Sequence, residues 1–124
     1  MILVYVAGPF SAPPGTPEPA KRSYVEQNIA NAVAVGLEVA AIGLYPVIPH
    51  ANTAHPGFEM LQPYKFWIDG TREVLRRACD TLILVPRWET SSGAREERAD
   101  MLGLGKPVFE SITALEEWSK LCLR

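Results

Sequence analysis

The sequence predicts an α/β domain built on a parallel sheet of four to five strands flanked by helices. Three observations support this prediction: a buried, β-rich run opens the chain, strands alternate with helices after it, and the length suits one core. The chain has 124 residues and is 48% hydrophobic and 21% charged. A chain of this size can bury a core without disulfides or metals. We therefore expect a single domain over residues 1–124.

The first strand and the loop that follows it are the clearest local features. The run 2–7 is continuously apolar, which is typical of a central parallel strand covered on both faces. Gly8 and Pro9 end this strand. The stretch 11–20 is rich in proline, so we expect an irregular loop there rather than a helix or strand. Loops in this position are often lids over a ligand.

The rest of the chain alternates between helical and extended patterns. The expected elements are a helix from the capping box Ser23–Glu26 to Gly43, a strand at 44–48, an irregular segment at 51–63, a helix at 64–78 that Gly70 interrupts, a strand at 81–85, a helix at about 93–104, a short strand at 108–109, and a last helix with a capping box from Thr113 to Glu116. This alternation predicts right-handed βαβ units and a flavodoxin-like or Rossmann-like sheet. Ligands bind such sheets beyond the carboxyl ends of the strands.

Composition excludes several classes of function. The formal net charge is −2 and the twelve Lys and Arg residues are scattered, so a nucleic-acid polymer is not the expected partner. Cys79 and Cys122 are too few for a disulfide framework and favour a reducing compartment, the cytoplasm. His50 and His55 lack the spacing of metal ligands. No apolar run approaches the roughly twenty residues of a membrane helix. We expect a small-molecule partner.

The loop before the helix at 93–104 is the most informative segment for chemistry. Ser91 and Gly93 offer a hydroxyl and backbone N–H groups at a helix N-terminus, where an anion is stabilised. Glu96 and Glu97 are expected in the first turn, where the helix dipole keeps a carboxylate ionised. Acids in a first turn are also ordinary helix design, and that alternative stays open. Helical spacing places Glu97 on the apolar side and Glu96 toward solvent, so Glu97 is the better candidate.

Three further residues have both a functional and a structural interpretation, and a fourth, Asp80, has only a structural one. The phenol of Tyr5 could hydrogen-bond a carboxylate at the end of the first strand, or simply pack in the core. Asp69 could be a general acid or a solvated surface residue. Trp88 could stack on a base or sit at the edge of the core. Asp80 lies at the amino end of the third strand, away from the ligand end, and is expected to be structural.

A set of short motifs occurs along the chain in a recognisable order. They are Tyr5–Phe10, Asn28–Ala30, Pro49–His50, Cys79–Asp80, and Trp88 followed by Ser91-x-Gly93-Ala94-x-x-Glu97. In this order they resemble the nucleoside 2-deoxyribosyltransferase-like superfamily, and in particular its short bacterial and phage branch. The resemblance extends to about Phe109. Each motif is weak by itself, whereas the ordered set is fairly specific.

The resemblance implies cleavage of an N-glycosidic bond through a covalent glycosyl intermediate on a glutamate. That glutamate matches Glu97, and the tyrosine that orients it matches Tyr5. Ser91 occupies a position where relatives that act on nucleotides tend to have Ser and those that act on free nucleosides tend to have Asp. By this analogy the substrate is a nucleoside 5'-monophosphate. The resemblance as a whole also implies no metal or organic cofactor, and a homodimer. The implied catalytic residues are Glu97, Tyr5 and Asp69, and the implied substrate-binding residues are Gly8, Pro9, Phe10, His50, Trp88, Ser91 and Gly93.

Two positions depart from the family pattern. The family's aspartate on the base side lies eight residues before the one that opens the third strand, and Arg72 stands there in this chain. Either Asp69, one helical turn earlier, substitutes for that acid, or the acid is absent. Arg87 replaces a common glycine. The sequence therefore leaves two alternatives open: a nucleotide-binding module without turnover, and a domain that acts through protein partners.

Overall fold

Four parallel strands form the central sheet, as the sequence predicted. A computed structural model describes residues 1–55 and 57–122 of the chain. The strands are β1 (Leu3–Ala7), β2 (Tyr45–Val47), β3 (Thr81–Leu84) and β4 (Val108–Phe109), and their order in the sheet is β2-β1-β3-β4. Every pairing is parallel. The single sheet with β1 and β3 at its centre confirms the predicted fold class.

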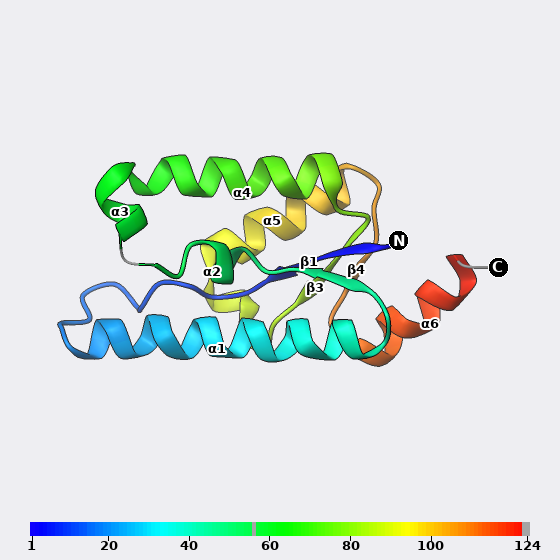
Figure 1. Cartoon of the computed structure of the whole chain (residues 1–124), viewed down its shortest axis with the longest axis horizontal. Helices are drawn as coiled ribbons and strands as arrows, with labels where there is room; N and C mark the ends of the chain where they lie inside the picture. The colour runs from blue at the N-terminus through cyan, green and yellow to red at the C-terminus, as the bar shows by residue number, and fades with distance from the viewer. Residues whose placement is uncertain (56, 123–124) are drawn as a thin grey trace.

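Helices cover both faces of this sheet, and α1 and α4 run along opposite sides of it (Figure 1). The helices are α1 (Ala20–Ala41), α2 (Pro49–Asn52), α3 (Gly57–Leu61), α4 (Tyr64–Ala78), α5 (Ser92–Gly103) and α6 (Ile112–Cys122), with a 3-10 turn at Trp88–Thr90. Within the described residues, no helix has the length and apolar character needed to cross a membrane.

The pleat of β1 decides which helices each of its side chains meets. Val4 and Val6 pack in one buried cluster with residues of α1 and α6. Tyr5 and Ala7 point to the opposite face and pack in a second cluster with residues of α4 and α5. Successive side chains of a strand alternate between faces, so this division follows directly from the sequence. The result is three layers, with the sheet in the middle.

The ends of two helices differ from the prediction. Helix α1 begins at Ala20, directly after Pro19, so Ser23 lies inside the helix and caps nothing. The N–H of Ala114 bonds to the hydroxyl of Ser111 at 3.2 Å, so α6 starts one residue before the predicted capping box at Thr113. In both places a Ser or Thr lies three residues before a Glu, which matches the capping-box pattern. The residue that precedes the first turn is instead Pro19 in α1 and Ser111 in α6.

The segment 51–63 is not wholly irregular, because it contains the end of α2 and the short helix α3. Helix α4 has the predicted bounds, and Gly70 does not interrupt it. Gly43 has a φ of +84° and follows α1, so it ends that helix as predicted. At the amino end of the sheet, the N–H of Leu3 bonds to the Asp80 carboxylate at 2.8 Å, which confirms the structural interpretation of Asp80.

At the opposite, carboxyl end of the sheet, Gly8 lets the chain leave β1 close against β3. A Cβ atom at Gly8 would lie 2.6 Å from the Cβ of Val85, a separation that real atoms do not tolerate. Glycine is therefore required for the close approach of the two chain segments. This contact fixes where the loop after β1 begins, and that loop forms one wall of the site described below.

Candidate active site

A cleft of about 670 Å³ opens at the carboxyl ends of the strands. Its walls come from the loop after β1, from α2, from the first half of α4 and from the start of α5. This is where parallel sheets of this class bind ligands. Of the residues expected from the sequence, those that line the cleft are Tyr5, Gly8, Pro9, Phe10, His50, Ser91, Gly93 and Glu97.

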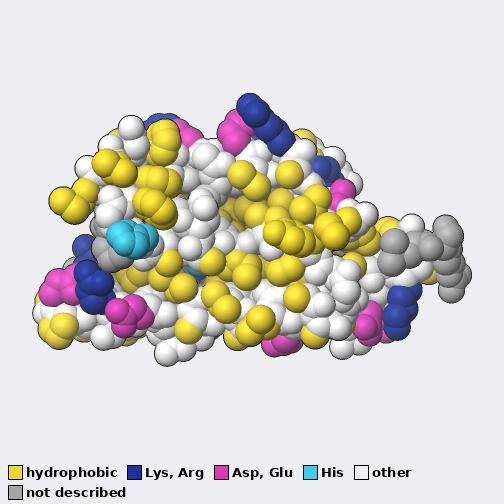
Figure 2. All heavy atoms as spheres, viewed as in Figure 1, with side chains coloured by type: hydrophobic (Ala, Val, Ile, Leu, Met, Phe, Trp, Pro, Cys, Tyr) yellow, Lys and Arg dark blue, Asp and Glu magenta, His cyan; other side chains and the backbone are white. Residues whose placement is uncertain are grey.

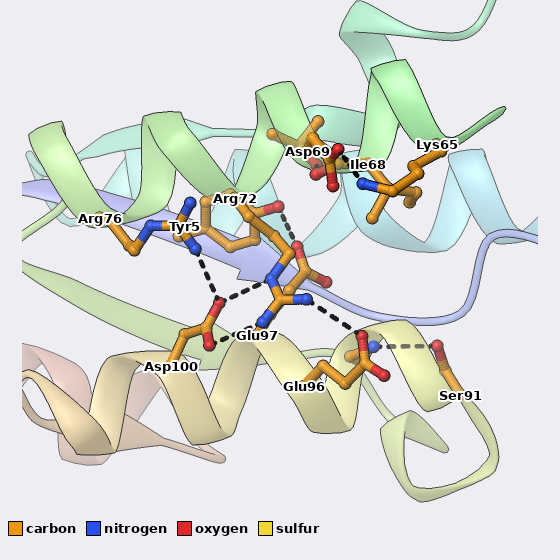
Figure 3. A network of polar contacts seen from close by, with 12 residues as sticks. Tyr5, Lys65, Ile68, Asp69, Arg72, Arg76, Ser91, Glu96, Glu97 and Asp100 are labelled. Atoms are coloured by element: carbon orange, nitrogen blue, oxygen red, sulfur yellow. Dashed lines mark hydrogen bonds and ion pairs between the residues drawn. The ribbon is translucent and has the colours of Figure 1, made fainter. Parts of the chain in front are cut away.

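A hydrogen bond between Tyr5 and Glu97 forms the centre of the site (Figure 3). Tyr5 is fully buried on β1, and its hydroxyl donates to Oε2 of Glu97 on α5. Burial raises the pKa of Tyr5 well above its ordinary value, and the nearby charge of Glu97 raises it further. The phenol therefore stays protonated and acts as a fixed donor to the carboxylate. Two residues far apart in the sequence thus make one polar pair inside the cleft.

The ionisation of Glu97 differs from the expectation. Helix α5 begins at Ser92, so Glu97 lies in its second turn, beyond the N–H groups that would stabilise a carboxylate. Burial raises the pKa of Glu97 to about 7, although the Tyr5 hydrogen bond and the charge of Arg72 oppose this change. Glu97 therefore keeps its proton to a higher pH than an ordinary glutamate does. The choice of Glu97 over Glu96 agrees with the structure, because Glu96 is exposed.

The start of α5 supplies polar groups at one end of the cleft. The hydroxyl of Ser91 accepts a hydrogen bond from the N–H of Ala94 at 3.1 Å and so caps the helix. A hydroxyl that accepts one bond still has a proton to donate. Arg87 and Arg95, which the sequence analysis did not single out as binding residues, line the same cleft. This end of the cleft therefore combines N–H, hydroxyl and cationic groups.

His50 and Asn28 hold the loop after β1 in place. Nε2 of His50 lies 3.1 Å from the carbonyl oxygen of Gly8 and 2.9 Å from that of Pro9, so this nitrogen carries the proton and donates it. Burial lowers the pKa of His50, which favours the neutral ring. Nδ2 of Asn28 donates to the carbonyl of Phe10 at 3.0 Å. A polar residue on the buried side of a long helix is the sequence signal that could have identified Asn28 as a residue that holds this loop.

The structure places two predicted site residues elsewhere. Asp69 is exposed and pairs with Lys65 on the same helix at 2.5 Å, and it lies outside the described lining of the cleft. Trp88 donates from Nε1 to Glu110 at 3.0 Å and packs on the α5 side of the core. Both positions match the structural alternatives that the sequence left open, the solvated aspartate and the aromatic at the edge of the core.

Aromatic residues other than Trp88 form an apolar wall of the cleft. Phe58, Tyr64 and Trp67 line the cleft on its α3 and α4 side. The rings of Phe58 and Trp67 are stacked, with centroids 4.9 Å apart and planes at 28°. A flat aromatic surface suits a planar ligand group. The cluster of aromatic residues at the start of α4 was visible in the sequence, but nothing in it showed that the cluster faces the same cleft as Glu97.

The sequence matches no protein-family model and no curated protein. What the site can do therefore has to be argued from its own groups. They are a half-buried carboxylate with a fixed phenol donor, a polar and cationic end, and an aromatic wall. Among the described residues, no cluster of His, Cys, Asp and Glu is suited to a metal ion. These groups suit a ligand with one planar part and one anionic part.

The raised pKa of Glu97 predicts a measurable cost in stability. The ordinary pKa of 4.5 applies in the unfolded chain, against about 7 in the fold, so the folded state holds the extra proton between these values. The free energy of unfolding therefore falls as the pH rises from about 4.5 to 7. Glu97→Gln should stabilise the protein more at pH 8 than at pH 5, by roughly 2 kcal/mol, in urea unfolding curves. Glu117→Gln, at an exposed position on α6, is the control. Equal gains from Glu97→Gln at both pH values would contradict this account.

Proposed function

We propose that the protein cleaves the N-glycosidic bond of a nucleoside 5'-monophosphate through a glycosyl ester on Glu97. The observation that carries this proposal is the Tyr5–Glu97 hydrogen bond inside the cleft. A carboxylate held by one fixed donor keeps its other oxygen free and aimed in one direction, which a nucleophile requires. The resemblance to nucleoside 2-deoxyribosyltransferase-like proteins implies the same role for both residues.

The reaction proceeds in two displacements at the anomeric carbon of the sugar. A carboxylate oxygen of Glu97 bonds to this carbon as the carbon–nitrogen bond breaks, and the base leaves with the electron pair and takes a proton from water. Water then attacks the same carbon and loses a proton, and the ester bond breaks to restore the Glu97 carboxylate. A second base in place of water would give transfer instead of hydrolysis. Neither step needs a metal or an organic cofactor.

The start of α5 is the proposed site for the 5'-phosphate. Ser91 and Gly93 supply a hydroxyl and a backbone N–H at a helix N-terminus, and Gly8 approaches from the other side of the cleft. Arg87 and Arg95 add positive charge that favours an anion. The base then lies toward the aromatic wall of Phe58, Tyr64 and Trp67. This orientation brings the anomeric carbon between the two ends, near Glu97.

One observation favours a second candidate, a nucleotide-binding module without turnover. Glu97 is the only carboxyl group in the described lining of the cleft, since Asp69 faces solvent and pairs with Lys65. A departing base would have no aspartate or glutamate of the protein to protonate it. Under this alternative, nucleotides would raise the melting temperature and no free base would appear.

We further propose that the chain forms a homodimer. Hydrophobic side chains gather over α3 and the start of α4, at the upper left of Figure 2. The large exposed side chains of this apolar patch are Met60, Leu61, Tyr64 and Phe66. Grouped apolar residues of this kind often form contacts between proteins. The apolar patch borders the cleft through Tyr64, so a second copy that covers it would also shape the site.

Base release tests the proposed reaction. Purified protein with each deoxynucleoside 5'-monophosphate should produce free base, measured by chromatography. Because the ionised carboxylate is the nucleophile, kcat/KM should rise with pH and level off above about 7, the pKa of Glu97. Glu97→Ala should reduce the rate by about 1000-fold or more. Glu117→Ala, at an exposed position on α6 outside the described lining of the cleft, should keep nearly full activity. An active Glu97→Ala variant would contradict the mechanism.

Ser91→Asp tests the phosphate end. Aspartate is as good a helix cap as serine, so the fold should keep its stability. Its negative charge repels a phosphate, so selectivity, the ratio of kcat/KM for a nucleoside 5'-monophosphate to that for the free nucleoside, should drop about tenfold or more. Ser111→Asp is the matched control, because Ser111 caps α6 in the same way and lies outside the described lining of the cleft. An unchanged ratio in Ser91→Asp would place the phosphate elsewhere.

Oligomeric state tests the dimer. Light scattering coupled to size exclusion should give twice the 13.7 kDa mass of one chain. The double variant Met60→Lys with Phe66→Glu should shift the protein to the monomer, because charges in a buried apolar interface are costly. Leu121→Lys, on the exposed side of α6, should leave the dimer intact. A monomer at high concentration in the unmodified protein would refute the dimer.

A further inference from the structure

Arg72 connects α4 to α5 by three hydrogen bonds from one guanidinium (Figure 3). Its Nε and Nη2 donate to the two carboxylate oxygens of Asp100 at 2.7 and 2.8 Å. Its Nη1 donates to Glu96 at 3.3 Å. The first pair is the two-pronged arrangement that a planar guanidinium forms with a carboxylate, and it fixes direction as well as distance.

The two acids that Arg72 binds stand on either side of Glu97 in α5. Glu96 comes immediately before it, and Asp100 follows three residues later, which is about one helical turn. Through these bonds, Arg72 holds the turn of α5 that contains Glu97 against α4. Arg72 itself lies outside the described lining of the cleft. Its side chain and that of Asp100 are both largely shielded from water, with exposed fractions of 28% and 19%.

The charges around Glu97 act in opposite directions. From β1, the Tyr5 hydroxyl bonds to the Glu97 carboxylate and lowers its pKa, and from α4 the positive charge of Arg72 lowers that pKa as well. On α5 itself, the negative charges of Asp100 and Glu96 raise the pKa of Glu97. Arg72 thus neutralises the two acids nearest to Glu97 in the helix and also attracts the charged form of Glu97.

We propose that Arg72 is a positioning residue of the active site, which holds the Glu97 turn against α4 and supplies the positive charge that favours the ionised nucleophile. This inference rests on the proposed role of Glu97. It also explains the departure noted in the sequence, where Arg72 stands at the place expected for an acid on the base side. In this chain the residue at that place turns toward α5 and acts through Glu97, without touching the substrate.

The test is the titration of the Glu97 side chain, followed by carbon-13 NMR and assigned with Glu97→Gln. Arg72→Met should raise the midpoint of this titration by about half a pH unit or more, because it removes a positive charge. Asp100→Asn should lower the midpoint, because it removes a negative one. Arg72→Lys keeps the charge and should restore most of the change. Arg77→Met is the control, since Arg77 is exposed and pairs with Glu73.

Opposite shifts in Arg72→Met and Asp100→Asn support the inference, because a purely structural role would loosen the same contact in both variants and move the midpoint the same way. Shifts of equal sign, or none in Arg72→Met, overturn it. Asp100→Asn and Arg72→Lys decide the question if Arg72→Met does not fold. The titration requires no turnover, so it is independent of whether the unmodified protein releases base. In an active enzyme, the pH profile of kcat/KM should follow the same shifts.

Discussion

The hydrogen bond from Tyr5 to Glu97 depends on two separate features of the chain that must agree. The pleat of β1 directs Tyr5 toward α4 and α5, and a shift of one residue in the strand would direct it to the opposite face. The cap at Ser91 sets where α5 begins. This start sets the rotation of the helix about its axis, which turns Glu97 toward Tyr5. Gly8 allows the strands to end close together beside this pair. The cleft forms around this meeting point of strand and helix.

The partial burial of the Glu97 carboxylate lowers the stability of the fold and increases the reactivity of the carboxylate. Burial raises the pKa of Glu97 to about 7, so the fold loses stability wherever this group has to be charged. The same burial leaves a charged carboxylate poorly solvated and therefore reactive. Tyr5 and Arg72 recover part of the cost through a hydrogen bond and a positive charge. Active sites commonly trade stability for reactivity in this way.

Periodic patterns in the sequence were enough to predict the sheet, the bounds of α4 and the buried side of α5 on which Glu97 lies. These features follow from short-range spacing, which the sequence displays directly. Local patterns misled where two signals competed, as at Ser23, which matched a capping box although α1 begins earlier. Spacing along one element does not show contacts between distant elements. The Tyr5–Glu97 contact was expected from the family resemblance, whereas which of Trp67 and Trp88 faces the cleft depends on how the helices pack and had no sequence signal. The ionisation of Glu97 depends likewise on burial, which spacing along one helix does not reveal.

The central claim is that Glu97 forms a covalent bond to the sugar. It is tested most directly by mixing the protein with a deoxynucleoside 5'-monophosphate, quenching with acid within the first turnover, and measuring the mass of the intact chain and its peptides. We predict an added deoxyribose 5-phosphate unit on the peptide that contains Glu97, absent from Glu97→Gln. Base release by the unmodified protein with the adduct on a different residue, or base release that persists in Glu97→Gln, would contradict the account.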